Sequence, residues 1–280
     1  MSLLTLEYIT HKIEDVKAIP EIITRIIGLT DNPDSTVTDV EKLVLRDQAL
    51  TSKILRLANS AYYGYARRIS TISEATVLLG FQAIKGIALA SMAKDYMSGE
   101  FKGYSLEEKQ LWNQSQTCAI ISRYIARELK YPNPEEAYIA GLLRDIGKTI
   151  LNEHMESEFK EVLSKVSSEG VTFLDAENEI FGYDHAEIGG IVAEKWNLPA
   201  VLIDAIKYHH TPDLSNINPV LVSIVHIADA MTMMMGVGIG LDGLSYNFSE
   251  TALNTLGLDE MEVQNIISAV SDLIKDTDSF

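Results

Sequence analysis

Five side chains in the second half of the sequence are the leading candidates for binding a divalent metal. They are Asp145, His185, His209, His210 and Asp229. Imidazole nitrogens and carboxylate oxygens form the ligand sets of many transition-metal centres, including those that activate water for hydrolysis. Because the five residues fall on consecutive expected helices, they could converge in the core of a helical bundle. The pattern is therefore a candidate remnant of a metal site.

Each of these residues also has a purely structural interpretation. A histidine near the end of a helix, such as His209 or His210, is a favourable partner of the helix dipole. Successive helical residues point about 100° apart, so these two imidazoles could serve one metal together only where the helix is ending.

The other candidates have local partners that could account for them. Asp184 and Glu187 have the spacing of a helix N-cap, which would place His185 in the first turn of a helix. Asp229 has the spacing for a pair with His226 one helical turn earlier.

Helix signals dominate the rest of the chain, and the predicted fold class is all-α with two packed helical lobes. Residues 20–31 show helical spacing after Pro20, and Thr38 with Glu41 and Thr71 with Glu74 have capping-box spacing. No segment shows sustained strand alternation, although a short strand could lie near Ile69. The other helices are expected at 38–44, 47–59, 71–97 with a kink at Gly80, 105–130, 135–154, 158–169, 172–180, 184–196, 199–210, 219–235 and 260–275.

The best candidate boundary between the lobes is the segment 98–104 (SGEFKGY), which has two glycines and little periodicity. It predicts an N-terminal helical lobe over residues 1–100 and a second helical lobe with a C-terminal extension over residues 101–280.

Composition and charge limit the classes of function. The chain has 280 residues and a formal net charge of −17, which repels nucleic acid at long range and predicts no nucleic-acid partner. No apolar run is long enough for a membrane helix, and the first residues lack the basic region of a signal peptide, so a cytoplasmic protein without a membrane partner is expected. Cys118, the only cysteine, excludes an internal disulfide framework and is expected in the core.

Two further patterns carry weaker indications. Residues 238–243 (GIGLDG) match a dinucleotide-binding spacing, but no parallel strands surround them, so a loop between helices is the better interpretation. The methionines at 231, 233, 234 and 235 are interpreted as core rather than as an exposed partner groove.

Longer stretches of the chain resemble the HDOD family. The N-terminal signature lies in residues 46–64 (RDQALTSKILRLANSAYYG), 69–75 (ISTISEA) and 78–80 (LLG). The HD-related half is similar in residues 111–115 (LWNQS), 140–147 (AGLLRDIG), 181–185 (FGYDH), 196–199 (WNLP) and 209–210 (HH). The likeness spans roughly residues 10–235.

The resemblance implies a relation to HD and HD-GYP phosphohydrolases, which bind one or two divalent metals. Their His-Asp doublet falls here on Arg144 and Asp145, and their early histidine falls on Gln114. Lys148 matches a lysine that often follows the doublet, and it could contact a substrate phosphate. His185, His209, His210 and Asp229 match the remaining ligand positions.

The two replaced positions weaken a metal site in different ways. Gln114 offers a poor ligand beside imidazole and carboxylate, and the guanidinium of Arg144 has no lone pair to offer a metal. Arg144 could instead be a counter-ion for Asp145 or Asp229. We therefore expect no cofactor, or at most one divalent transition metal.

The expected function is a non-catalytic signal-transduction module that binds protein partners, as the HDOD resemblance implies. The residues 57–64 form a turn that could also be a binding surface. The alternative is a metal-dependent phosphohydrolase acting on a nucleotide or cyclic dinucleotide. A third interpretation is a sensor whose former metal pocket holds a nucleotide-type small ligand.

Overall fold

The computed structural model describes residues 6–14, 18–59, 68–154, 158–238 and 248–275, and these form helices without a β-strand. The all-α class is thereby confirmed. An isolated bridge between Phe101 and Leu106 is the nearest approach to sheet in the described part of the chain, and Ile69 lies in no strand.

The described residues fall into two compact units. The larger unit comprises Met1–Lys17 and Asp95–Ile267, and the smaller unit comprises Ala18–Lys94 and Ser268–Phe280. The division of the chain into two domains at residues 98–104, which the sequence suggests, stays a prediction.

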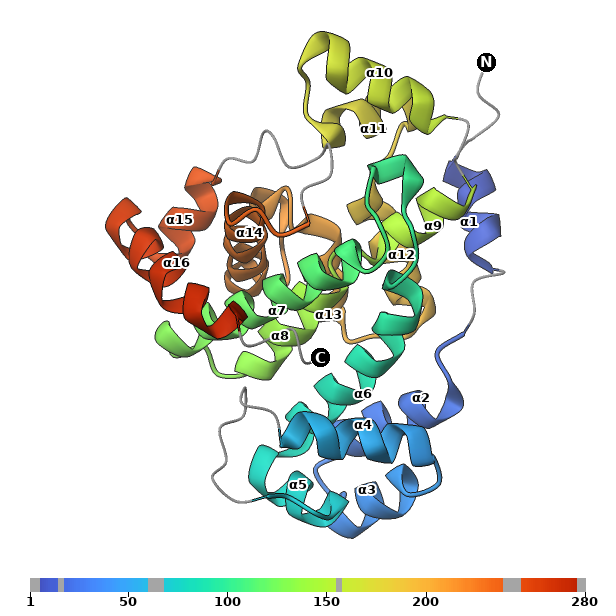
Figure 1. Cartoon of the computed structure of the whole chain (residues 1–280), viewed down its shortest axis with the longest axis vertical. Helices are drawn as coiled ribbons and strands as arrows, with labels where there is room; N and C mark the ends of the chain where they lie inside the picture. Colours follow the sequence, from blue (N-terminus) through green and yellow to red (C-terminus); the bar gives the residue numbers. More distant parts are fainter. Residues whose placement is uncertain (1–5, 15–17, 60–67, 155–157, 239–247, 276–280) are drawn as a thin grey trace. The chain divides into compact units, whose positions relative to one another are not determined.

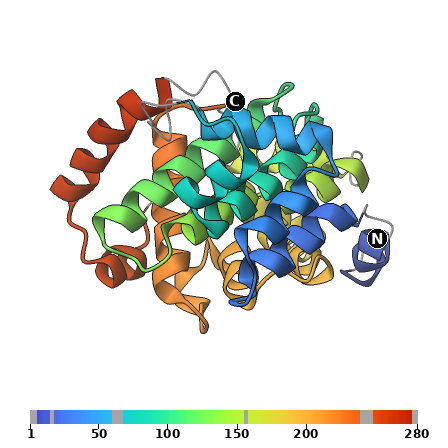
Figure 2. The same ribbon diagram turned by 90° about the horizontal axis from the view of Figure 1, so that it is seen from below.

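The smaller unit contains the helices α2 (Glu21–Asp31), α3 (Val37–Val44), α4 (Gln48–Ala58) and α5 (Ile72–Leu79), followed by most of α6 (Phe81–Met97). The helices α2 to α5 lie together in Figure 1 and in the perpendicular view of Figure 2. Their buried faces carry Val40, Ile54 and Ala75, each of which is fully buried.

Side-chain caps fix where the helices of the smaller unit begin. Thr71 accepts a hydrogen bond from the Glu74 amide, as its spacing predicts. The cap of α3 is formed by Thr36 and Asp39, so the predicted pair Thr38 and Glu41 was wrong by two residues. Both pairs have the required spacing, and only the observed one has its first residue in extended conformation before the helix.

Gly80 ends α5 rather than kinking one long helix. Its φ of +84° closes α5, and α6 leaves at an angle of 115° to it. No single described helix is both long and apolar enough to cross a membrane, and only this bent pair reaches that length together.

The larger unit is built around α7 (Gln110–Glu128) and α8 (Pro134–Leu143), which lie side by side and contact α14 (Pro219–Met234). The other α-helices of this unit are α1 (Leu6–Glu14), α9 (Ile146–His154), α10 (Phe159–Glu169), α11 (Phe173–Phe181), α12 (His185–Lys195), α13 (Ala200–Tyr208), α15 (Glu250–Leu256) and α16 (Glu260–Lys275), which extends beyond the unit. Short 3₁₀ turns lie at Lys102–Tyr104 and Pro212–Leu214.

Several local expectations can be compared with this arrangement. Cys118 is fully buried, which confirms its place in the core. Met231 and Met233 are buried as expected, whereas Met234 is 59% exposed. The helices α1 and α15 were missed by the sequence reading. All of the glycine-rich segment 238–243 except Gly238 lies outside the described residues, as does most of the segment 57–64.

Candidate functional site

Four of the five candidate ligands converge in the larger unit. One ligand atom from each of Asp145, His185, His209 and His210 lies within 4.8 Å of the other three. Asp145 comes from the break between α8 and α9, His185 is the first residue of α12, and the two later histidines follow α13 directly. Residues far apart in the chain thus meet at the ends of three helices.

The break at residues 144–145 corrects the prediction of one continuous helix over 135–154. The α8 helix ends at Leu143, and α9 begins at Ile146, with the Lys148 amide donating to the Asp145 carbonyl. This turn places Asp145 between the two helices. Its charged side chain is only 1% exposed.

A glycine contact holds α9 against α12 beside this turn. A Cβ atom at Gly147 would lie 2.0 Å from the His185 carbonyl oxygen and 2.6 Å from the Gly189 amide nitrogen. The two backbones can therefore approach this closely only because residue 147 has no side chain. The contact places His185 next to Asp145, with 3.3 Å between His185 Nε2 and Asp145 Oδ1.

His185 is oriented by a carboxylate that the sequence reading missed. Glu177 on α11 is fully buried, and its Oε2 lies 2.7 Å from His185 Nδ1 and accepts the His185 amide at 3.0 Å. The Tyr104 hydroxyl donates to Glu177 Oε1 at 2.5 Å. A carboxylate behind an imidazole is how metal-binding histidines are commonly held. Neither Glu177 nor Tyr104 stands in a spacing that the sequence marks as functional.

His209 and His210 share the pocket because α13 ends at Tyr208. The Nδ1 of His209 lies 2.8 Å from the Ile206 carbonyl, which assigns its proton to Nδ1 and leaves the Nε2 lone pair facing inward. That Nε2 is buried without a hydrogen-bond partner among the described residues and lies 3.9 Å from Asp145 Oδ1. His210 Nε2 lies 2.9 Å from His185 Nε2.

Asp229 does not join this cluster. Its Oδ1 accepts a 2.6 Å hydrogen bond from Nε of Arg144, which is fully buried. The expected local pair of Asp229 with His226 is wrong, because His226 Nδ1 instead lies 2.7 Å from the His209 carbonyl.

The guanidinium of Arg144 reaches both predicted acidic ligands. Its Nη2 is 3.0 Å from Asp145 Oδ2, at ion-pair distance but without hydrogen-bond alignment, and its Nη1 donates to the Gly141 carbonyl. Arg144 therefore has the inward, ion-paired position that the sequence suggested for a counter-ion.

Gln114 and Lys148 do not take the positions that a metal ligand and a phosphate contact would have in a hydrolase. Gln114 donates from its amide nitrogen to the Gly238 carbonyl at 2.5 Å, so its side chain is engaged with a loop. Lys148 is 1% exposed, and its ammonium lies 3.2 Å from Asp145 Oδ1 and 5.4 Å from the centre of the Tyr104 ring. The expected phosphate contact of Lys148 is thus replaced, within the described residues, by an internal ion pair.

The charges of the pocket shift the pKa values of its members. Burial opposes the charge on Asp145, but the adjacent Arg144 and Lys148 cations hold the pKa of its carboxyl well below the ordinary value. Burial would also lower the pKa of His185, but the Glu177 carboxylate beside it raises this pKa to about 10. Burial lowers the pKa of His209 to about 4, which leaves it neutral at pH 7.

The donor set fits one divalent ion and does not fit two. A transition metal would suit the ligand set here, which consists of one carboxylate and three imidazoles. The carboxylate is that of Asp145, and the imidazoles are those of His209, His210 and, after loss of its proton, His185. The unpartnered Nε2 of His209 is a donor with no other described role. A second ion would need Asp229 and the residue at 114, and both are engaged elsewhere.

This helical fold and the converging histidines at its helix ends define a protein of the HD-like class. The sequence matches the HDOD domain family over residues 16–212, and the chain belongs to this family.

Several known proteins are similar to this chain, and one of them is named for the same domain. An uncharacterized protein of Treponema pallidum is 31% identical over 216 residues, which cover 72% of this chain but only 39% of that protein. An HDOD domain protein of unknown function from Geobacter sulfurreducens has a similar structure, with a TM-score of 0.78 and 27% identity over 98% of this chain and 97% of that one. A Shewanella amazonensis protein provisionally named a phosphohydrolase has a TM-score of 0.74 and 24% identity, with 96% of each chain covered, which shows the shared fold.

Proposed function

We propose that this chain is a non-catalytic regulatory module of the HDOD family, whose former metal pocket is held together by an internal ion-pair network. The observation that carries the proposal is the buried guanidinium of Arg144 between Asp145 and Asp229. An arginine cannot give up its proton in a protein, so this positive charge is permanent.

The network is neutral without a metal. Three cationic groups face three carboxylates, namely Arg144, Lys148 and protonated His185 against Asp145, Glu177 and Asp229. A buried cluster with balanced, mutually paired charges avoids most of the cost of unpaired burial. Ions added to this pocket would meet a permanent cation. At about 4 Å and an effective dielectric near 20, each unit of like charge opposes binding by roughly 4 kcal/mol.

The partner of such a module is a protein of a signalling pathway. A solved structure from Marinobacter aquaeolei that bears a signal-transduction name shares the fold, with a TM-score of 0.75 and 22% identity over 99% of this chain and 60% of that one. The net charge of −17 disfavours nucleic acid as the partner. With no hydrolysis at the pocket, the fold serves recognition.

A single-metal phosphohydrolase is the second candidate, and one observation favours it. The buried Nε2 of His209 has no described partner and faces Asp145, as a metal ligand would. A bound ion would supply an activated water at this place. Asp145 and the three histidines would hold it, while Glu177 orients His185.

Turnover distinguishes the two candidates, because a metal content below two equivalents is compatible with both. We expect protein purified without chelator to contain less than two equivalents of metal, and to hydrolyse bis-(p-nitrophenyl) phosphate and nucleotides at the rate of the buffer when manganese or iron is added. Two bound metals per chain would contradict the proposal. So would turnover that is lost in Asp145→Ala but kept in Asp213→Asn, an exposed carboxylate chosen as the matched control.

A further inference from the structure

The smaller unit contains a cavity at the C-terminal end of α4 that is separate from the histidine pocket. Its volume is about 960 Å³, and it lies between α4 and the segment 68–70. Ser52, Leu55 and Arg56 of α4 and the C-cap residue Asn59 recur at intervals of three and four, so they form one stripe along the helix. This stripe lies opposite the residues that α4 buries in its own unit.

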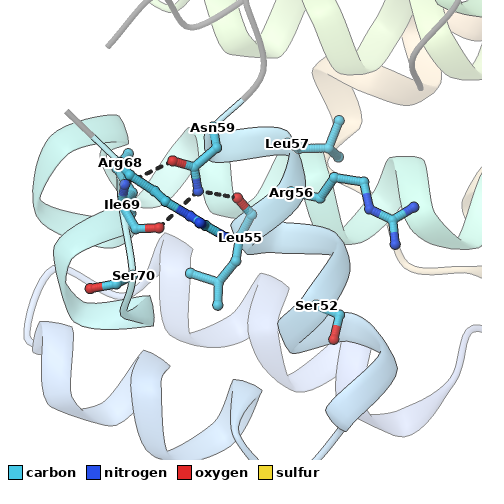
Figure 3. Close-up of a pocket in the computed structure, with 8 residues that line it drawn as sticks. All are labelled: Ser52, Leu55, Arg56, Leu57, Asn59, Arg68, Ile69 and Ser70. Atoms are coloured by element: carbon cyan, nitrogen blue, oxygen red, sulfur yellow. Dashed lines mark hydrogen bonds between the residues drawn. The ribbon is translucent and has the colours of Figure 1, made fainter. Parts of the chain in front are cut away.

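A side-chain clamp gives this cavity a fixed wall. The amide oxygen of Asn59 accepts the Ile69 amide at 2.8 Å, and its amide nitrogen donates to the Ile69 carbonyl at 2.8 Å and to the Leu55 carbonyl at 2.6 Å (Figure 3). The Ser70 amide donates to the Glu74 carboxylate. The segment 68–70 is thus tied to α4 through Asn59 and to α5 through Glu74. These bonds fix the backbone next to Arg68.

The charge of the cavity is opposite to that of the chain. Arg56 and Arg68 line it, and none of the described lining residues is acidic. Both residues are exposed, and neither guanidinium has an ion-pair partner among the described residues. In a chain with a net charge of −17, two unpaired arginines at one cavity form a local attraction for an anion.

The remaining lining restricts the kind of anion. Leu55, Leu57 and Ile69 give the cavity an aliphatic part, which a bare inorganic anion would leave unused. Figure 3 shows the Arg68 side chain running past Asn59 towards Leu55 and the Arg56 side chain pointing away to the right, so a ligand that meets both guanidiniums is extended. Guanidinium groups bind phosphate oxygens through paired hydrogen bonds, and the Ser52 and Ser70 hydroxyls can add more.

The geometry points to a binding site for an extended, phosphate-bearing small molecule of nucleotide size. The cavity volume lies within the range of small-ligand sites, which is about 300–1,000 Å³. This inference goes beyond the regulatory role proposed above, because it places a ligand on the other unit and does not depend on the histidine pocket.

Isothermal titration calorimetry of the full chain with ATP in EDTA tests the site. We expect measurable binding of ATP, and much weaker binding of adenosine and of inorganic phosphate at equal concentration. Arg56→Gln and Arg68→Gln should each weaken ATP binding about tenfold, and Arg56→Lys should weaken it less because the charge is kept. Melting temperatures of the variants establish that they are folded.

Two control variants make the result specific. Arg25→Gln removes the same charge from an exposed position on α2, outside the cavity, and should leave ATP binding unchanged. Asp145→Asn changes only the histidine pocket and should also leave it unchanged. Absence of ATP binding at millimolar concentration would overturn the inference. It would also be overturned if the Arg56 and Arg68 variants bound ATP as tightly as the unchanged protein does. Tighter binding of a polyglutamate peptide than of ATP would overturn it as well.

Discussion

The buried ion pair of Arg144 gives the sharpest quantitative test of this structure. Arg144→Met keeps much of the side-chain volume and removes the charge that faces Asp145 and Asp229. Asp145 retains Lys148 and His185 as partners, whereas Arg144 is the only cation that the described residues place against Asp229. Removal of one partner from a buried pair costs about 3–5 kcal/mol, since the other charge stays buried and unpaired.

A double-mutant cycle separates this effect from simple loss of packing. Asp229→Asn added to Arg144→Met removes the stranded charge, so the double variant should be more stable than the sum of the single effects by about 1–3 kcal/mol. Arg127→Met is the matched control, because Arg127 is 55% exposed and its pair with Glu135 is worth about 0–1 kcal/mol.

Tryptophan fluorescence is the suitable assay. Both tryptophans of the chain, Trp112 and Trp196, are buried in the larger unit, so their emission during unfolding by denaturant or by heat reports on the unit that contains Arg144. At roughly 2–4 °C per kcal/mol, Arg144→Met should lower the melting temperature by roughly 6–20 °C. A loss no larger than that of Arg127→Met, or strictly additive effects in the cycle, would refute the ion-pair reasoning.

Three further outcomes follow from the same geometry. Gly147→Ala should destabilise the protein by several kcal/mol because its Cβ would meet backbone atoms at 2.0 Å, whereas Gly28→Ala, with open space around it, should be neutral or stabilising by up to about 1 kcal/mol in thermal unfolding. The Cys118 thiol, whose pKa burial raises to about 12, should resist a disulfide reagent at pH 8 and react fully in denaturant. The pKa of His185 in the folded protein is raised to about 10, so its stabilising contribution is complete below pH 6.5 and is lost as the pH rises towards 10. Glu177→Gln should flatten this part of the curve of unfolding free energy against pH. An unchanged slope in that variant would contradict the pairing of His185 with Glu177.

Local chemistry explains why most helices could be predicted from the sequence. Helical spacing of apolar residues and N-caps such as Thr71 and Asp184 depend on neighbours within one turn, and both of these caps are present in the structure. The same local rules failed at residues 144–145, where apolar residues on both sides continue the helical pattern across the break. They also did not identify α1 and α15.

The pocket shows where sequence information ends. The residue types alone identified Asp145 and the three histidines as candidate ligands, but their convergence depends on how the helices that carry them pack together. The direction of the Arg144 side chain was decided by Asp229, 85 residues further along the chain, and the position of His185 was decided by Glu177 and by the glycine contact between α9 and α12. Such pairings depend on which helices pack against each other, and the local sequence patterns do not specify that.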